Sequence, residues 1–463
     1  MTDAPRPDTG TSRRRFLQDS AGLGLAAAAP FVLNLADIGA AAAATATDYK
    51  ALVCVFLFGG NDHANTLVPY DATSHALYSS ARSAIALARS DLAATALTPA
   101  TPPAGGVQYA LAPTLAPLLP IFNAGRMAAV LNVGTLIQPT TKAQYLARNV
   151  PLPPRLFSHN DQQSFWQAST TEGARSGWGG RMADLFLLQN TSPTLSAINA
   201  ASNAVFLTGR TTSPYAVTTA GPVTLNGNAA TLFGSTTAAA TLQSLVGTAQ
   251  PGLLANELAR TSSRALTTYG QVSTALAAAP AIRTPFPAGN TLADQLRIVA
   301  RLISVSQELG AKRQVFFVSL GGFDLHAGLA TTQPLLLGRV ADALRAFYDA
   351  TVELGVANRV TAFTASDFGR TLVSNSSGSD HGWGSMHFVL GGAVKGREFY
   401  GRPPVLADNG PDDVGQGRLL PAISVDQYAA TLASWFGVSD ASMASVLPFI
   451  GNYPAASRNL GFL

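Results

Sequence analysis

Three short apolar segments, each followed by small residues and an aspartate, constrain the fold of this chain most strongly. They are residues 52–58, 315–320 and 360–364, and the aspartates that follow them are Asp62, Asp324 and Asp367. Runs this continuously apolar are typical of strands buried on both faces, as in a parallel sheet covered by helices. The sequence therefore predicts an α/β fold around a buried sheet.

A helix is predicted between the second and third of these strands. Its apolar residues recur at helical spacing along one face, at Leu336, Val340, Leu344, Phe347 and Tyr348. Gly355 stands where a glycine commonly ends a helix. Because a strand–helix–strand unit is right-handed with parallel strands, the second and third aspartates leave the sheet at the same edge. Ligands bind at this carboxyl edge in open α/β sheets.

Other elements can be placed from local signals. Further strands are expected at residues 128–133 and 387–390. Ser158 precedes Asp161 by three residues, and Ser424 precedes Gln427 by three. This spacing is typical of a capping box, so we expect a helix to begin after each serine.

Residues 190–290 differ in character from the rest, since they are rich in Ala, Thr, Ser, Gly and Asn and carry hardly any charge. A part of this stretch, about 253–279, has a helical pattern, whereas 218–237 reads as loops or weak strands. We interpret the stretch as an insertion or lid within one domain that covers residues 45–463.

The N-terminal residues predict export by the twin-arginine pathway. Arg13 and Arg14 stand before an apolar stretch at about 21–35, and residues 40–46 offer A-x-A cleavage sites. The alternative is a short membrane helix, but polar residues and a proline interrupt a stretch that would need about 20 apolar residues to span a bilayer. We therefore expect a signal peptide at 1–44 and a mature chain, without a membrane span, in the periplasm or outside the cell.

Composition favours a globular protein that does not bind nucleic acid. Hydrophobic residues make up 47% of the chain and charged residues 12%, and the formal net charge is only +4. No run of Lys or Arg follows the signal, so nucleic acid is an improbable partner on charge grounds. The single cysteine, Cys54, excludes an intramolecular disulfide and lies in the first apolar run, where a buried core thiol is expected.

Candidate metal ligands cluster around the strand ends. Of the six histidines, five lie in or beside the motifs described above. Asp324 and His326 are two residues apart, so both side chains point to one face if that segment is extended, and together they could bind a metal. The alternative is a turn aspartate and a structural histidine. Asp62 has the same alternative, because Asn-Asp favours turns.

A second Asp/His pair lies further along the chain. Asp380 and His381 are flanked by glycines, and His387 follows six residues later. With Asp367 nearby in sequence, this loop could supply half of a metal site. The alternative is that both histidines only form local hydrogen bonds.

Arg370 and Ser158 each have two interpretations. Arg370 could bind the oxygens of a phosphate or sulfate, or form an ion pair with Asp367. Ser158 could be an ordinary N-cap, or a nucleophile placed at the positive end of a helix dipole.

The chain resembles a large exported bacterial family of uncharacterised proteins (domain of unknown function fifteen-oh-one). The resemblance covers nearly the whole mature chain and is weakest over 190–290. The motifs that carry it, besides the twin-arginine signal, are residues 58–62, 65–69, 158–162 with Trp166, 177–181, 321–326, 366–371, 380–384 and 387–392.

That family in turn looks like a branch of the alkaline phosphatase and sulfatase superfamily. The resemblance implies a doubly wound, mostly parallel sheet with helices on both faces and two divalent metals, zinc, calcium or magnesium, at the strand ends. It assigns Asp62, Asp367 and a nucleophilic Ser158 to one site. It assigns Asp324, His326 and either His381 or His387 to the other. The chain departs from the superfamily where Phe368, rather than a histidine, follows Asp367.

These observations lead to two hypotheses. The first is an exported metal-dependent hydrolase of phosphate or sulfate esters, or a relative that has lost activity, with a small anionic ester or a glycan as substrate. In it Ser158 is the nucleophile, Arg370 holds the non-bridging oxygens, and His159 replaces Ser158 if the serine is only a cap. The second is a non-catalytic surface protein that binds an exported protein partner or a glycan through the same cleft.

Overall fold

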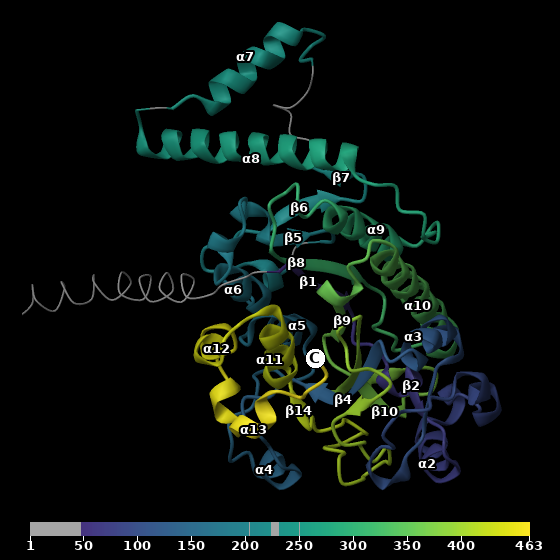
Figure 1. Cartoon of the computed structure of the whole chain (residues 1–463). Helices are drawn as coiled ribbons and strands as arrows, with labels where there is room; N and C mark the ends of the chain where they lie inside the picture. Colours follow the sequence, from purple (N-terminus) through teal and green to yellow (C-terminus); the bar gives the residue numbers. More distant parts are fainter. Residues whose placement is uncertain (1–47, 203, 224–230, 250) are drawn as a thin grey trace, which may run out of the picture.

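The computed structural model describes residues 48–202, 204–223, 231–249 and 251–463 (Figure 1). The predicted export segment and its cleavage sites therefore lie outside the described residues.

The core of the molecule is a ten-stranded sheet in the order β13-β4-β12-β9-β1-β8-β5-β6-β7, with β14 paired to β4. β1 pairs in parallel with both β8 and β9, whereas β12 is antiparallel to β4 and β9. The predicted α/β fold with a mostly parallel sheet is confirmed, and the strands that precede the three aspartates form its centre. The strands are β1 (Lys50–Leu57), β4 (Met127–Gly134), β5 (Ala197–Asn199), β6 (Tyr215–Thr218), β7 (Gly221–Pro222), β8 (Arg313–Leu320), β9 (Val360–Ser366), β12 (Ser385–Gly391), β13 (Phe399–Tyr400) and β14 (Ile423–Ser424).

Helices cover both faces of the sheet, because side chains of each central strand alternate between two hydrophobic cores. In β1, Val53 and Val55 pack in one core and Cys54 and Phe56 in the other. The expected burial of Cys54 is confirmed. The first core is covered by α3 (Leu119–Asn123), α9 (Thr291–Ser304) and α10 (Leu329–Glu353), and the second by α6 (Trp178–Asp184), α11 (Val425–Phe436) and α12 (Asp440–Val446) (Figure 1).

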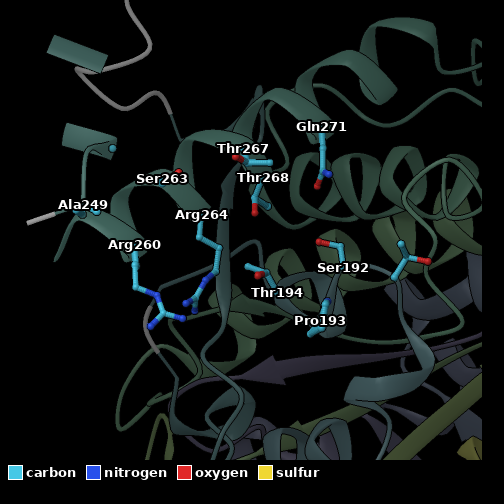
Figure 2. A pocket seen from close by; sticks show the side chains of 13 residues that line it. Ser192, Pro193, Thr194, Ala249, Arg260, Ser263, Arg264, Thr267, Thr268 and Gln271 are labelled. Carbon is cyan, nitrogen blue, oxygen red and sulfur yellow. The ribbon is translucent and has the colours of Figure 1, made fainter. Parts of the chain in front are cut away.

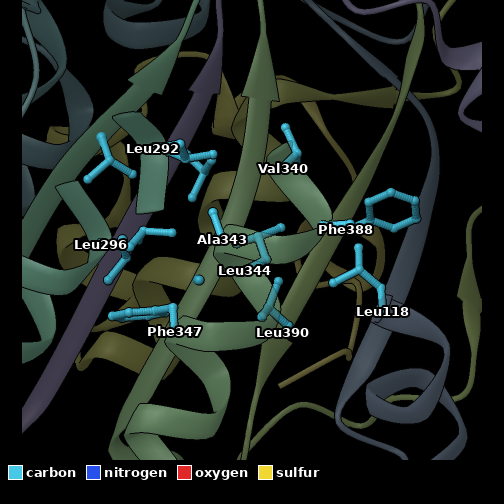
Figure 3. Packing of buried hydrophobic residues seen from close by; sticks show 14 of the residues in the cluster. Leu118, Leu292, Leu296, Val340, Ala343, Leu344, Phe347, Phe388 and Leu390 are labelled. Carbon is cyan, nitrogen blue, oxygen red and sulfur yellow. The ribbon is translucent and has the colours of Figure 1, made fainter. Parts of the chain in front are cut away.

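The helix predicted between the second and third central strands is α10. Its apolar stripe faces the sheet, and Leu344 and Phe347 lie beside Leu296 of α9 and Leu390 of β12 (Figure 3). Gly355 follows the helix with a φ of +69°, a conformation that favours glycine. The predicted strand–helix–strand unit is therefore confirmed.

The Ala- and Thr-rich stretch contains both sheet and helix. Strands β5 to β7 extend the main sheet. Beyond that edge lie α7 (Thr236–Gly247) and α8 (Leu253–Ala278), and α8 matches the helix predicted at about 253–279 (Figure 1). An open groove of about 510 Å³ lies between α8 and the loop that contains Ser192 and Thr194, with Arg260 and Arg264 on its α8 side (Figure 2).

Two small sheets and the remaining helices complete the fold. β2 (Leu67–Pro69) pairs with β3 (Tyr109–Leu111), and β10 (Arg370–Ser374) pairs with β11 (Ser379–His381). The predicted capping box of Ser424 and Gln427 is confirmed at the start of α11. In the described part of the chain, no helix is long and apolar enough to cross a membrane. The remaining helices are α2 (Ala72–Arg82), α4 (Lys142–Ala147), α5 (His159–Ala168) and α13 (Ala455–Arg458).

Candidate metal centre

The loops after β1 and β8 approach one another closely at the carboxyl edge of the sheet. Phe58 donates a backbone hydrogen bond to Leu320, and Phe323 donates one back to Phe58. Gly59 has a φ of +113°, and a Cβ at this position would lie 2.4 Å from the backbone nitrogen of Asp324. Only glycine permits this approach, which places Asp324 beside the end of β1.

Asp324 lies at the centre of a cluster of three imidazole rings. Its Oδ1 is 3.1 Å from His326 Nε2 and 3.3 Å from His381 Nε2, and its Oδ2 is 3.3 Å from His159 Nε2. Potential ligand atoms of His159, Asp324 and His381 all lie within 4.8 Å of one another. The three rings come from α5, the loop after β8 and β11, so distant segments of the chain meet here.

Each of these rings is fixed by an oxygen that accepts a hydrogen bond at Nδ1. His159 Nδ1 lies 2.6 Å from Asp367 Oδ2, His326 Nδ1 lies 2.9 Å from Asp380 Oδ1, and His381 Nδ1 lies 2.7 Å from the Phe157 carbonyl oxygen. Because these acceptors cannot donate, each Nδ1 carries a proton, and the lone pair of a ring in its neutral form lies at Nε2. Metal-binding histidines in proteins are oriented in this way.

The charges around Asp324 keep it ionised. Burial alone would raise its pKa, but the hydrogen bond and positive charge of Arg370 hold the pKa below its usual value. A hydrogen bond to the Asp367 carboxylate raises the pKa of His159, whereas burial lowers that of His381. The cluster therefore contains one carboxylate anion beside His381, whose neutral form is favoured, and His159, from which a bound cation would displace the proton.

Arg370 is fully buried and binds Asp324 directly. Its Nη1 donates to Asp324 Oδ1 over 2.7 Å, and its Nη2 donates to the Ser379 carbonyl oxygen. An ion pair with Asp367, one of the two interpretations of Arg370, is therefore wrong. Arg370 starts β10, which points its side chain back toward the loop after β8 instead.

Asp367 lies behind His159. Its Oδ2 accepts hydrogen bonds from His159 Nδ1 and, over 2.8 Å, from Gln163 Nε2, while its Oδ1 accepts one from the Gly59 backbone nitrogen. This fully buried carboxylate therefore lies next to the imidazole cluster, but it contacts Nδ1 of His159 and not the Nε2 atom that faces Asp324.

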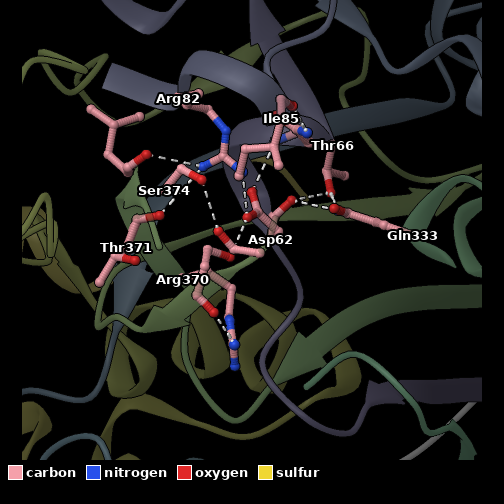
Figure 4. A network of polar contacts seen from close by, with 12 residues as sticks. Asp62, Thr66, Arg82, Ile85, Gln333, Arg370, Thr371 and Ser374 are labelled. Carbon is pink, nitrogen blue, oxygen red and sulfur yellow. Dashed lines mark hydrogen bonds and ion pairs between the residues drawn. The ribbon is translucent and has the colours of Figure 1, made fainter. Parts of the chain in front are cut away.

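Both carboxylate oxygens of Asp62 have hydrogen-bond or ion-pair partners within the chain (Figure 4). Its Oδ2 lies 2.5 Å from Arg82 Nη2 and accepts a 2.7 Å hydrogen bond from Ser379 Oγ, and its Oδ1 accepts one from the Asn65 backbone nitrogen. Burial opposes ionisation of Asp62, yet the Arg82 charge holds its pKa below the usual value. These contacts match the alternative that Asp62 is a turn residue.

Residues 49–444 match the family model described as "Protein of unknown function (DUF1501)". The chain belongs to this family. A search of curated protein sequences gave no match.

Several solved structures resemble this family member. One is Ps i-CgsB in complex with k-i-k-neocarrahexaose, with 9% identity, a TM-score of 0.35 and coverage of 88% of this chain and 77% of the other. Another is a Bacteroides thetaiotaomicron protein solved in work on the metabolism of multiple glycosaminoglycans, with 9% identity, a TM-score of 0.33 and coverage of 85% and 74%. A third is alkaline phosphatase from the Antarctic bacterium TAB5, with 11% identity, a TM-score of 0.27 and coverage of 77% and 95%.

The side chains of Ser158 and His387 contact residues outside the imidazole cluster. Ser158 is the N-cap of α5, as predicted, but the expected capping hydrogen bond is wrong, since its Oγ donates to Asp161 Oδ2 over 2.8 Å. A hydroxyl bound to a buried carboxylate forms a stronger bond than one that accepts from an amide. His387 is buried in β12 against Trp166, and burial lowers its pKa to about 3.

Six of the residues proposed from the sequence belong to the cluster, in two roles. Asp324, His326 and His381 converge, and His159, considered only as a substitute nucleophile, joins them through its Nε2. Asp367 and Asp380 orient two of the rings. Sequence reasoning missed the Phe157 carbonyl group and Arg82, neither of which carries a local signal for its role.

Proposed function

We propose that this chain is an exported metal-dependent hydrolase of phosphate or sulfate esters, with its metal bound by His159, Asp324 and His381 and with His326 as a fourth ligand. The observation that carries the proposal is the orientation of the three rings. Each Nδ1 is occupied by an oxygen acceptor, and each Nε2 is directed toward the Asp324 carboxylate.

The residues fit a divalent metal on two grounds. His159 Nε2 is buried and has no hydrogen-bond partner among the described residues. His326 Nε2 and His381 Nε2 lie 2.9 Å apart although both rings present lone pairs there, an arrangement that a cation relieves. A set of imidazole nitrogens with one carboxylate is typical of zinc.

A divalent ion bound here supplies Lewis acidity and lowers the pKa of a bound hydroxyl or water. The chain's own residues do the positioning. Asp367 and the Phe157 carbonyl group hold two rings in the tautomer that exposes Nε2. Arg370 keeps Asp324 ionised and, because it is fully buried, acts through that carboxylate rather than on a substrate.

Ser158 is the nucleophile that we propose for this chemistry. It directly precedes His159, so its backbone is tied to the metal centre, and it begins α5, whose free amides and dipole favour an anionic ester. Asp161 Oδ2 accepts a hydrogen bond from the Ser158 hydroxyl and is itself buried, so it orients that hydroxyl, while activation of the serine would come from the metal. An exposed Arg155 side chain, 3.8 Å from the same carboxylate, supplies a nearby positive charge.

One observation favours the second function, a metal-free protein that binds a partner or glycan. Arg370 already neutralises part of the Asp324 charge. If this ion pair replaces the metal, the cleft is a binding surface without catalysis.

An assay of ester hydrolysis distinguishes the two proposed functions. The purified mature chain should hydrolyse at least one member of a panel of chromogenic phosphate and sulfate esters, and a chelator should abolish the activity, which added zinc, calcium or magnesium should restore. His381→Ala should be inactive, while Asp349→Asn, which alters a surface carboxylate on α10, should keep full activity. Activity that survives both the chelator and His381→Ala would contradict the proposal.

Export by the twin-arginine pathway rests on Arg13 and Arg14. Replacing both by lysine should leave the precursor in the cytoplasm, because the pathway's receptor recognises the arginine pair. Normal appearance of that double variant outside the cytoplasm would exclude this route.

A further inference from the structure

A separate cavity of about 220 Å³ lies beside the first turns of α10, across from the segment Pro113–Leu118. Its walls are mainly apolar, with Leu87, Leu329 and Leu337 among them. Ala330, which also lines it, is exposed, so the cavity borders solvent at the start of α10. None of the residues of the proposed metal centre lines this space.

Among the described residues, two polar atoms in the cavity wall have no hydrogen-bond partner. They are Gln333 Oε1 and Thr114 Oγ1. Only 1% of Gln333 is exposed. An unpaired buried polar atom is costly, so such atoms in native proteins usually have a partner that the protein itself does not supply.

The orientation of the Gln333 amide is fixed by its other end. Gln333 Nε2 donates to the Asp62 carbonyl oxygen over 2.8 Å and lies 3.3 Å from Thr66 Oγ1 (Figure 4). Rotating the amide by half a turn would place Oε1 against the Asp62 carbonyl oxygen and lose the 2.8 Å bond. Gln333 Oε1 therefore remains available to accept a hydrogen bond from another molecule.

We propose that this cavity is a binding site for a small, mainly apolar molecule that carries one hydroxyl or amide N–H group. The apolar walls bury its carbon skeleton, Gln333 Oε1 accepts its hydrogen bond, and Thr114 Oγ1 is available as a second polar contact. The volume is below the range of about 300–1,000 Å³ that is usual for drug-sized ligands, which limits the ligand to a smaller molecule.

Benzyl alcohol and toluene test the proposal, because they have similar shape and differ in the hydroxyl group. Binding to the mature wild-type chain can be followed by ligand-observed NMR and by the rise in melting temperature with ligand concentration. We expect benzyl alcohol to bind more tightly than toluene. Ala330→Leu, which places a larger side chain in the cavity, should weaken the binding of benzyl alcohol at least about tenfold, because a close-packed cavity cannot hold both the leucine side chain and the ligand. Ala76→Leu, at an exposed helical alanine of α2, should have no effect.

The polar contact has its own test. Gln333→Leu should remove the preference for benzyl alcohol over toluene, and Thr114→Val serves as the companion variant if Gln333→Leu does not fold. Failure of benzyl alcohol to bind the wild type, which would indicate that water alone occupies the cavity, overturns the proposal. Equal binding to wild type and Ala330→Leu overturns it as well.

Discussion

Asp62 and Asp324 end neighbouring parallel strands and follow the same glycine-rich motif, yet they occupy different environments. Asp62 is 2% exposed and bonded to Arg82, Ser379 and a backbone amide. The Asp324 side chain is 44% exposed and contacts three imidazole Nε2 atoms as well as Arg370. The strand-end motif thus places a carboxylate at the carboxyl edge, but the segment that packs over it decides whether the carboxylate is structural or available to a ligand.

Removing the Asp62 charge should produce the largest loss of stability. Asp62→Asn leaves the fully buried Arg82 without its counter-ion, so we expect the free energy of unfolding to fall by about 3–5 kcal/mol. Asp324→Asn should lower it by less than Asp62→Asn does, because the Asp324 side chain is nearly half exposed and solvent screens its ion pair with the buried Arg370. Urea unfolding measures both. The double variant Asp62→Asn with Arg82→Met should recover much of the loss, and equal effects of the two single variants would remove the contrast.

Asp426 sharpens the comparison, because it is a buried carboxylate with no direct cationic partner among the described residues. Burial raises its pKa to about 6. The native state therefore binds a proton more tightly than the unfolded state, and stability falls as the pH rises from about 4 to about 6, by an amount on the order of 2–3 kcal/mol.

Asp426→Asn should abolish this pH dependence. An amide can still accept from the Phe449 backbone nitrogen and can donate to Ser169 Oγ, the two partners that the carboxylate has. The difference in unfolding free energy between the variant and the wild type should shift in favour of the variant as pH rises from 4 to 7. A difference that stays constant over this range would show that Asp426 has an ordinary pKa.

The carboxylates that hold the rings provide a smaller contrast within the proposed centre. Asp367 is fully buried behind His159, whereas Asp380 is partly exposed beside His326. We expect Asp367→Asn to weaken metal binding about 10–100-fold, as is typical for such partners, and Asp380→Asn to weaken it less. Titration with zinc against a competing chelator measures both affinities, and the reverse order would mean that His326 is the stronger ligand.

Ser158→Ala should have the smallest effect on stability. Loss of the hydrogen bond to Asp161 should cost about 1 kcal/mol. If the serine is the nucleophile, turnover of an active ester should fall by orders of magnitude at the same time. A variant that keeps most of its turnover would limit the role of the serine to its hydrogen bond with Asp161 at the start of α5.

The central strands of the sheet and the helix that covers them could be predicted from the sequence. Apolar runs at β1, β8 and β9 and the stripe of α10 predicted three neighbouring strands with their aspartates at one edge. The sequence was also sufficient for part of the cluster, since Asp324 and His326 lie close together in the chain. Strands β5 to β7 are only two to four residues long and lack an apolar run, so the sheet edge that they form had no clear signal.

Contacts between distant segments could not be predicted. Arg82 contacts Asp62 from the end of α2, and nothing in the residues between them, twenty positions apart in sequence, indicates that the helix returns to that point. The orientation of His159 depends on Asp367, 208 residues away, so its Nε2 could not be assigned to the cluster from sequence alone. For Ser158, the capping motif correctly predicts where α5 begins, but it does not predict that the hydroxyl donates to Asp161.

The metal content of the purified mature chain tests the central claim most directly. After equilibration with zinc, calcium and magnesium and removal of free ions, mass spectrometry of the metals should find a divalent ion bound at the proposed centre of the wild type. Asp324→Asn and His381→Ala should lose that ion while remaining folded, and Asp349→Asn should keep it. A wild-type chain that binds none of the three metals, or an Asp324→Asn variant that binds as much as the wild type, would contradict the account.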